Sequence, residues 1–300
     1  MSRVFVIGSC NTDMVIKAAK LPGPGETIIG GEFFMNPGGK GANQAVAAAR
    51  LGAAVAFACK IGNDIFGKQA VEGFRREGIH TDFVLTAGDQ PSGIALILVD
   101  GKGENSIAVA SGANGNFRLE EAEDVIEQIG PGDIVLLQLE IPVTVVEYTI
   151  KSCRKRGAVV ILNPAPAHLL ADEVFPFIDI ITPNETGAEW LTGVKVTDLT
   201  SAAAAATIFL DKGVTHVVIT LGAKGAYLHD GSVQKMIASP AVDAVDTTAA
   251  GDIFNGALAV AIAEKEKLES AVEFACRAAS ISVTRLGAQS SAPRRSELNH

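Results

Sequence analysis

The sequence predicts an α/β fold with a central, mainly parallel β-sheet, helices on both of its faces, and a small additional β-sheet that acts as a lid. Two observations support the central sheet: short apolar runs recur along the chain, and helical patterns separate most of them. A third observation supports the small sheet, because two segments consist of short strands and turns without a helix between them. Alternation of strands and helices favours parallel pairing through right-handed crossovers.

The strands of the central sheet are predicted from apolar runs. Several runs are apolar at every position instead of alternating, which is typical of strands that are covered on both faces. These runs span residues 3–8, 54–62, 133–139, 157–163, 178–184 and 216–222.

The helices are predicted from patterns that lie between or after these runs. Several of the patterns end in a glycine, which suits the left-handed position that follows many helices. The predicted helices span residues 41–52, 66–78, 119–130, 142–157, 201–213 and 251–265.

The lid is predicted from residues 11–38 and 91–112, which together form the second unit of the chain. The stretch "DGKGEN" at 100–105 lies between two apolar runs and indicates a hairpin. Because the apolar strands of such a sheet need cover, we expect a lid over the site, a dimer surface, or both. The main α/β domain then comprises residues 1–10, 39–90 and 113–300.

The composition excludes several classes of function. The chain has 300 residues, of which 48% are hydrophobic and 20% charged, as in globular proteins with a large core. Its net charge of -9 argues against nucleic acid or an anionic membrane surface as the main partner. An anionic substrate would therefore need local positive charge or helix N-termini.

The cysteines and the N-terminal residues predict a cytoplasmic protein. The four cysteines are scattered without a CxxC pair, so that neither structural zinc nor a disulfide framework is indicated. The stretch "MSRVFVIGSC" enters a strand-like run without the layout of a signal peptide. No apolar run approaches the ~18 residues of a membrane span.

Polar and small residues follow the predicted strands, where ligands bind in open parallel sheets. "GSCNTD" follows the first strand, Glu140 follows "DIVLLQL", and "NPAPA", "PNE" and "GAKG" follow three later strands. Three nucleotide motifs are absent from the sequence: GxxxxGK[ST], GxGxxG after a strand, and the HRD and DFG pair of protein kinases.

"DTTAAGDIFNGAL" at 246–258 predicts a site for phosphoryl transfer. The small residues Ala249, Ala250 and Gly251 would leave their N–H groups open at the N-terminus of a helix, where oxyanions bind. Asp252 beside such a site would orient and deprotonate a hydroxyl that attacks the phosphoryl group. Taken alone, Asp252 is equally well explained as a helix cap.

"NPGGKGANQAVAAARLG" at 36–52 favours the catalytic interpretation. Its consecutive glycines let backbone approach a ligand. Lys40 and Asn43 offer donors to hydroxyl groups, as Asn11 and Asp13 could from the first loop. Paired Asp and Asn side chains suit a polyol better than an apolar ligand.

Together these two segments resemble the signature regions of the ribokinase family of carbohydrate kinases, also called the PfkB family. The resemblance extends over essentially the whole chain and includes "PGET", "GENSIAVASGAN", "LNPAPA" and "DIITPNET". It implies a Rossmann-like α/β domain with a β-lid, and a homodimer formed through the lid strands. The implied reaction is ATP-dependent phosphorylation of D-ribose at the 5-hydroxyl to give D-ribose 5-phosphate and ADP.

The resemblance also implies roles for individual residues. Asp252 would be the catalytic base, and Ala249, Ala250 and Gly251 would form the anion hole. The residues that hold the sugar would be Asn11, Asp13, Gly39, Lys40, Asn43 and Glu140. ATP, with Mg²⁺ or a similar divalent cation, would bind at Asn184, Thr220, Gly222, Ala223, Lys224, Gly225, Gly251 and Cys276. A monovalent activator, usually K⁺, would bind at Asp246, Thr248, Ser282, Arg285, Gly287 and Ser291, mostly through backbone carbonyls.

Two positions depart from the family pattern. Gly187 stands where the family's Asn-x-x-Glu motif has Glu, while Glu185 and Glu189 are out of register. We therefore expect weaker handling of Mg²⁺ or phosphate. Ile253 replaces a common Thr, and we expect that loss of a hydroxyl to be tolerated.

Other functions stay open from the sequence. Fructokinase, 2-keto-3-deoxygluconate kinase and adenosine kinase share the implied mechanism, and "GIALILV" at 93–99 could line a slot for a nucleobase. Gly187 also leaves open a sugar-binding sensor with impaired catalysis. Intact Asp252 and its small-residue loop argue against that sensor.

Overall fold

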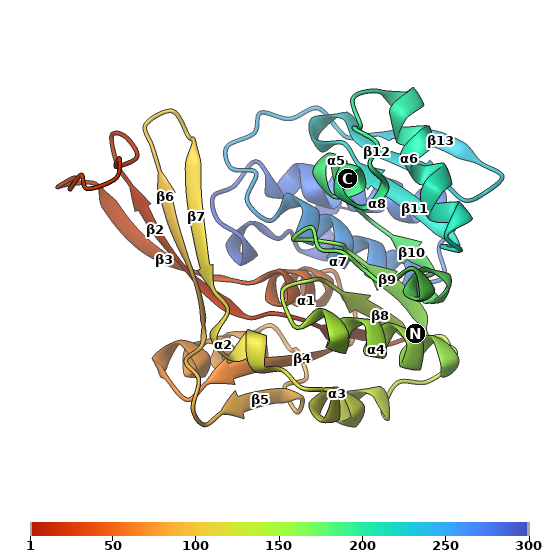
Figure 1. Ribbon diagram of the computed structural model, residues 1–300, viewed down its shortest axis with the longest axis horizontal. Coiled ribbons are helices and arrows are strands. Elements are labelled where there is room, and N and C mark those ends of the chain that lie inside the picture. Colours follow the sequence, from red (N-terminus) through yellow and green to blue (C-terminus); the bar gives the residue numbers. More distant parts are fainter. Residues whose placement is uncertain (1, 299–300) are drawn as a thin grey trace.

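The central sheet has nine strands in the order β13-β12-β11-β10-β9-β8-β1-β4-β5. The computed structural model, which describes residues 2–298, places this sheet in the body of the molecule (Figure 1). Every pairing from β5 to β11 is parallel, and the two pairings β11-β12 and β12-β13 are antiparallel. The strands are β1 (Val4–Ile7), β4 (Val55–Gly62), β5 (Val84–Ala87), β8 (Ile134–Leu137), β9 (Val159–Leu162), β10 (Ile180–Ile181), β11 (His216–Thr220), β12 (Gly225–His229) and β13 (Gln234–Ala238).

The predicted α/β class with a mainly parallel sheet is confirmed. The sequence did not predict β5, β12 or β13. β13 and β5 are the two edge strands of the sheet, each with one neighbour, and β12 is the next strand in from β13. Such edge strands carry a weaker apolar signal than strands buried on both faces.

Helices cover both faces of the sheet because the side chains of each strand alternate. Val4 and Val6 of β1 pack in one core cluster with residues of α1, α2, α7 and α8. Phe5 and Ile7 pack on the other face with residues of α3, α4, α5 and α6. The helices are α1 (Lys40–Arg50), α2 (Ile65–Arg76), α3 (Leu119–Ile126), α4 (Val143–Lys155), α5 (Glu185–Thr192), α6 (Leu199–Asp211), α7 (Ala250–Ala263) and α8 (Leu268–Ser282).

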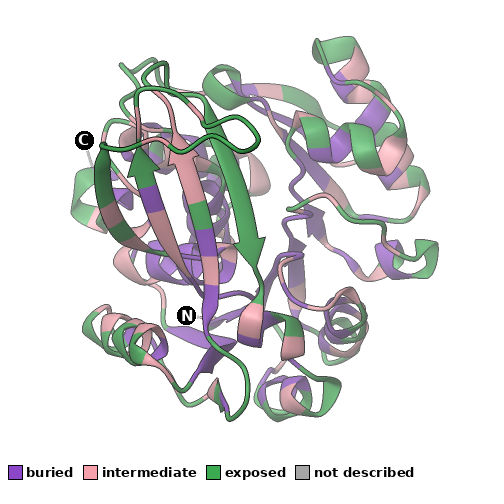
Figure 2. Cartoon of the chain, turned by 60° about the vertical axis from the view of Figure 1, so that its left-hand side comes forward, coloured by how far each residue is buried: buried purple, intermediate pink, exposed green. Residues whose placement is uncertain are grey.

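The small sheet has four strands in the order β3-β2-β6-β7. It projects from the body, with an exposed outer end and a more buried base (Figures 1 and 2). The strands are β2 (Asn11–Lys17), β3 (Glu32–Gly38), β6 (Gly93–Val99) and β7 (Asn105–Ala110). They come from the two segments that the sequence singled out, and β2 begins just beyond the carboxyl end of β1.

No helix within residues 2–298 combines the length and the hydropathy that a membrane crossing requires.

The remaining turns of helix are short and of the 3-10 type: η1 (Gly112–Asn116), η2 (Asp172–Phe177), η3 (Gly222–Lys224), η4 (Gln289–Ser291) and η5 (Arg295–Leu298).

Candidate active site

Asp252 lies in the first turn of α7, and its carboxylate is held by two amide side chains. Its Oδ1 accepts a hydrogen bond of 3.0 Å from Nε2 of Gln44, and its Oδ2 accepts one of 2.9 Å from Nδ2 of Asn43. Burial raises the pKa of Asp252, while the Lys40 ammonium group and the two amides oppose that rise. A carboxylate with a raised pKa is a stronger base, as proton removal from an alcohol requires.

The close packing of α7 on α1 places Asp252 beside these amides. A Cβ atom at Gly256 would lie 2.7 Å from Cβ of Ala47 and 2.7 Å from the backbone oxygen of Gln44. Glycine at this position therefore lets the two helices approach, and the approach brings the first turns of both helices together.

Lys40 lies among three carboxyl groups at the base of the small sheet. The charge of Asp252 raises the pKa of Lys40, burial opposes that effect, and Glu140 and Asp13 add to it. The backbone N–H of Lys40 donates to Oε2 of Glu140 at 3.0 Å, and the Ser9 hydroxyl donates to the same oxygen. The cluster can thus bind hydroxyl groups with both donors and acceptors.

The pKa of Asp13 on β2 differs from its ordinary value. Burial raises its pKa to about 6, the charges of Glu140 and Asp252 raise it as well, and Lys40 opposes them. Gly38 leaves room for this carboxyl group, because a Cβ there would lie 2.3 Å from it. Perturbed groups of this kind are concentrated at functional sites.

Gly39 and Asn11 complete the cluster. Gly39 has φ of 90°, and a Cβ there would lie 2.7 Å from the backbone nitrogen of Asn11. Asn114, which sequence reasoning missed, donates from Nδ2 to Oδ1 of Asn11 at 2.7 Å. Oδ1 of Asn43 is buried and accepts no hydrogen bond from residues 2–298. All six residues predicted to hold the sugar therefore lie around the carboxyl end of β1 or on the elements that join there.

A cavity of about 520 Å³ lies on the other side of the first turn of α7. Seven of the eight predicted ATP residues line it: Asn184, Thr220, Gly222, Ala223, Gly225, Gly251 and Cys276. Lys224 is not among its lining residues. Sequence reasoning missed the apolar wall formed by Val242, Phe254, Ala279 and Val283. These residues carry no motif, because their common property is only that the fold brings them together.

The N-terminus of α7 joins the two regions. Ala249, the residue before the helix, has left-handed φ and ψ of 59° and 12°. The N–H of Ala250 donates to the Thr247 carbonyl at 3.2 Å, whereas in residues 2–298 the N–H groups of Ala249 and Gly251 have no acceptor. Two of the three N–H groups predicted for an anion hole are thus open. The third is occupied by a turn.

The loop before α7 is tied to the segment after α8 through Asp246. Oδ1 of Asp246 accepts from the Thr248 N–H at 2.9 Å, and Oδ2 accepts from the Gly287 N–H at 2.8 Å. Although burial acts in the other direction, these bonds hold the pKa of Asp246 below its ordinary value. The N–H groups of Val245 and Asp246 both donate to the Val283 carbonyl.

The other residues predicted for a monovalent cation lie in the same segment. The Arg285 N–H donates to the Ser282 carbonyl at 3.0 Å, and the Arg285 side chain pairs with Glu297. Within the described chain, no hydrogen bond reaches the backbone carbonyls of Thr248, Arg285 or Gly287. Ser291 is fully buried, and its hydroxyl donates to the Ala288 carbonyl; within residues 2–298 no hydrogen bond joins it to the other five. Residues 2–298 contain no group of three His, Cys, Asp or Glu side chains suited to a metal ion.

The two departures from the family pattern have different surroundings. Gly187 lies in the first turn of α5, where its N–H donates to Oδ1 of Asn184 at 2.7 Å. Glu185 lines the 520 Å³ cavity, but Glu189 is exposed and does not line it. Ile253 is fully buried in the apolar cluster under α7, so a hydroxyl at this position would have an apolar environment.

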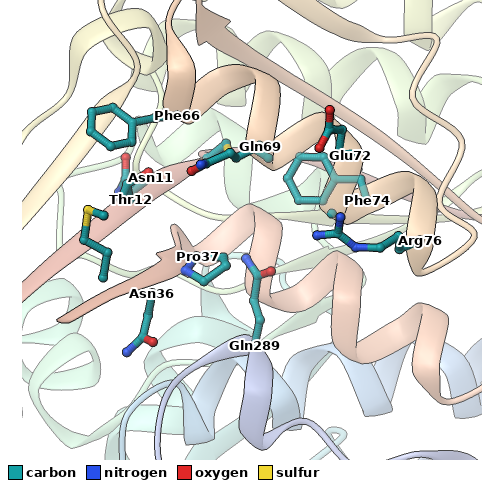
Figure 3. Close-up of a pocket in the computed structure, with 14 residues that line it drawn as sticks. Asn11, Thr12, Asn36, Pro37, Phe66, Gln69, Glu72, Phe74, Arg76 and Gln289 are labelled. Carbon is teal, nitrogen blue, oxygen red and sulfur yellow. The ribbon is translucent and has the colours of Figure 1, made fainter.

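A second cavity, of about 420 Å³, lies between α2 and the base of the small sheet (Figure 3). Thr12 and Pro37 line it from the sheet, and Phe66 and Arg76 line it from α2. Asn11 is the one predicted site residue that lines it, and the carboxylates of Asp13, Glu140 and Asp252 do not.

Comparison with known proteins connects these features to a family. The family model described as pfkB family carbohydrate kinase matches residues 1–295. A ribokinase of Haemophilus influenzae is 48% identical over 97% of this chain and 95% of its own length. A ribokinase of Bacillus subtilis is 42% identical over 99% and 98% of the two chains. The structure of an Arabidopsis thaliana ribokinase complexed with ribose and ATP superposes with a TM-score of 0.91, at 35% identity over 99% and 98%.

Proposed function

Because the chain belongs to the pfkB family of carbohydrate kinases, we propose that it transfers the γ-phosphoryl group of ATP to the 5-hydroxyl of D-ribose. The products are D-ribose 5-phosphate and ADP. The observation that carries the proposal is the position of Asp252. Its buried carboxylate contacts the amide of Asn43 in the polar cluster, and the preceding residue, Gly251, lines the large cavity. A base at that junction lies between an alcohol and a nucleotide.

The polar cluster is suited to a sugar because it supplies acceptors and donors in a small space. Asp13 and Glu140 accept from hydroxyl groups, and the Lys40 ammonium group donates to them. The buried Oδ1 of Asn43 has no partner within residues 2–298, and an unsatisfied buried acceptor costs about 1–3 kcal/mol. A sugar hydroxyl that donates to it would remove that cost.

The transfer step assigns a role to each group at the start of α7. Asp252 takes the proton of the 5-hydroxyl, the oxygen forms a bond to the γ-phosphorus, and the bond to the β–γ bridging oxygen breaks. The N–H groups of Ala249 and Gly251 and the positive end of the helix dipole stabilise the charge on the transferred group. ADP leaves with the bridging oxygen.

The 520 Å³ cavity is the proposed site of ATP. Its apolar wall of Val242, Phe254, Ala279 and Val283 fits an adenine ring, and its small residues let backbone approach the phosphates. Mg²⁺, when bound, would offset the negative charge of the ATP phosphates. Glu185 is the carboxylate in the lining that would hold it, because Gly187 offers none.

Asp246 and the open carbonyls near it are the proposed site of a K⁺ ion. Carbonyl oxygens without hydrogen bonds are the ligands that replace the hydration shell of K⁺. Such an ion would order the loop that ends at the anion hole. Activity measured in K⁺ should exceed activity in tetramethylammonium several-fold. Equal rates in the two cations would refute the proposed K⁺ site.

We also propose that a second copy of the chain covers the outer face of the small sheet. Strand register places Ile16 opposite Phe33, and places Met35 and Leu96 both beside Met14, so these side chains share one face while Asp13 lies on the other. Ile16, Phe33, Met35 and Leu96 are all exposed, and contiguous apolar surface of this kind marks interfaces. Leu96→Lys should convert a dimer to a monomer in light scattering. Leu169→Lys, at an exposed leucine on the body, is the matched control.

The location proposed for the protein is the cytoplasm. Cys10, Cys59, Cys153 and Cys276 are all buried free thiols, which fits a reducing compartment. Cell fractionation would test this location directly.

The test of the function is ADP release from MgATP with D-ribose, beside fructose, 2-keto-3-deoxygluconate and adenosine. We expect D-ribose to give the highest kcat/KM, and Asp252→Asn to lower kcat by about 10²–10⁴-fold with ATP binding intact. A higher kcat/KM for another substrate in the panel would keep the mechanism and change the substrate. Tight ribose binding without ADP release would favour a sensor.

A further inference from the structure

Two buried glutamines form a chain of hydrogen bonds that ends on Asp252. Nε2 of Gln138 donates to Oε1 of Gln44 at 2.6 Å, and Nε2 of Gln44 donates to Oδ1 of Asp252 at 3.0 Å. Both glutamine side chains have no exposed surface. Sequence reasoning assigned no role to either residue, because Gln44 lies in an alanine-rich helix and Gln138 at the end of an apolar run.

The chemistry of the groups sets the direction of this chain. An ionised carboxylate only accepts hydrogen bonds, so Gln44 must turn its amide nitrogen toward Asp252. The second N–H of Gln44 reaches Oδ1 of Asn163 at 3.3 Å, and Nδ2 of Asn163 donates to the Thr182 carbonyl at 3.1 Å. Oε1 of Gln44 is then left to accept from Gln138.

We propose that Gln44 is a positioning residue that holds the Asp252 carboxylate ionised and in a fixed orientation for proton removal, and that Gln138 fixes the orientation of Gln44. This inference rests on the proposed role of Asp252 as the base. Asn43 and Gln44 each use one lone pair of a different carboxylate oxygen, and each oxygen keeps another lone pair for the substrate proton.

Packing alone does not explain the two glutamines. A methionine would fill a similar volume in the apolar surroundings without buried polar atoms. Instead, Oε1 of Gln138 is buried without a hydrogen-bond partner in residues 2–298, which is unfavourable. A Cβ at Gly8 would lie 2.0 Å from that oxygen, so the residue directly after β1 also keeps space for Gln138. These features lower the stability of the protein, and a positioning function explains why the chain contains them.

The electrostatic consequence can be measured. Burial raises the pKa of Asp252 and the charge of Glu140 adds to that rise, while the Lys40 ammonium group and the hydrogen bonds from Asn43 and Gln44 oppose it. Removal of the Gln44 donor therefore raises the pKa further. Because the base must be ionised, the acid limb of the kcat profile then moves to higher pH.

The experiment compares kcat against pH for Gln44→Met, Gln138→Met and the wild type, with D-ribose and MgATP. For Gln44→Met we expect the acid limb to move up by about one pH unit and kcat on that limb to fall about tenfold. KM for ribose should stay within about twofold, because Asp13, Lys40 and Glu140 are unchanged. Gln138→Met should move the limb in the same direction by a smaller amount. Gln128→Met, an exposed glutamine beyond α3, is the matched control and should match the wild type.

The outcomes separate this inference from the proposed function. An unchanged acid limb in folded Gln44→Met would overturn the inference, even if the melting temperature falls. If Gln44→Met does not fold, an unchanged limb in Gln138→Met overturns it. Asp252→Asn with activity near that of the wild type would reject Asp252 as the base, and the inference would fall with it.

Discussion

The polar cluster proposed to hold the sugar, called the sugar cluster below, and the 520 Å³ cavity proposed to hold ATP adjoin the same helix N-terminus but are built in opposite ways. The sugar cluster consists of charged side chains that lie close together: the half-buried Lys40, Asp13 and Glu140 and the buried Asp252. The cavity consists of small residues, backbone and an apolar wall. Recognition of the sugar would depend on which polar side chains are present, whereas recognition of ATP would depend on the shape of the cavity. Substitutions should therefore affect the two sides differently.

The largest effect on substrate affinity is expected for Asp13→Asn on the sugar side. The substitution removes a charged acceptor, and hydrogen bonds to charged groups contribute about 1.5–3 kcal/mol, so KM for ribose should rise by about 10–100-fold. KM for ATP should change little. In the wild type, ribose affinity should fall as the pH drops through about 6, where Asp13 becomes protonated.

The same variant should be more stable than the wild type at high pH. The folded state raises the pKa of Asp13 from 3.8 to about 6, so the folded protein binds this proton more tightly than the unfolded chain does. Asp13 thus lowers stability as the pH rises through this range, and above it the loss is on the order of 3 kcal/mol. The gain in melting temperature for Asp13→Asn should be present at pH 8 and absent near pH 4. An equal gain at both values would show that charge is not its cause.

On the nucleotide side, Ala279→Phe should obstruct the cavity. Ala279 belongs to the apolar wall, and a phenyl ring there would occupy volume that the adenine needs. We expect KM for ATP to rise about tenfold or more and ribose binding, measured by calorimetry, to stay unchanged. Ala203→Phe on α6, which is not in the cavity lining, controls for the size of the added ring. A parallel loss of ribose affinity in Ala279→Phe would show that the two sides are not separable.

The contrast between the two sides also explains what could be predicted from the sequence. Lys40, Asn43 and Asp252 were found because glycines and alanines surround polar residues in two short motifs. Gln44 was not found, since a glutamine in a helix becomes informative only through its contacts. The wall of the cavity comes from α7, α8 and a loop, and apolar residues there look like any other core residue. Lys224 follows a strand as the other site residues do, yet it lies outside the cavity lining.

A smaller effect is expected where the sequence departs from the family pattern. Gly187→Glu would add a carboxylate in the first turn of α5, close to Asn184 and Glu185, where the helix N-terminus favours negative charge. A Cβ there would lie 3.1 Å from Oδ1 of Asn184, so the fit requires only a small shift. We expect the Mg²⁺ concentration for half-maximal activity to fall and kcat to rise by a few-fold. Gly187→Gln, which has the same shape without the charge, should not reproduce this effect, and an unchanged Mg²⁺ dependence in Gly187→Glu would refute the prediction.

The smallest effect is expected at Ala249, the residue before α7, where the sugar cluster and the nucleotide cavity meet. A non-glycine residue in the left-handed region costs about 1–2 kcal/mol, whereas glycine costs about 0.5–1 kcal/mol more than alanine in lost chain entropy. Ala249→Gly should therefore stabilise the protein by no more than about 1 kcal/mol in urea unfolding. Ala250→Gly, one residue later with helical geometry, is the matched control and should destabilise it by a similar amount. Destabilisation by both variants would show that the φ of 59° at Ala249 carries no strain, and the start of α7 would then be held by its contacts alone.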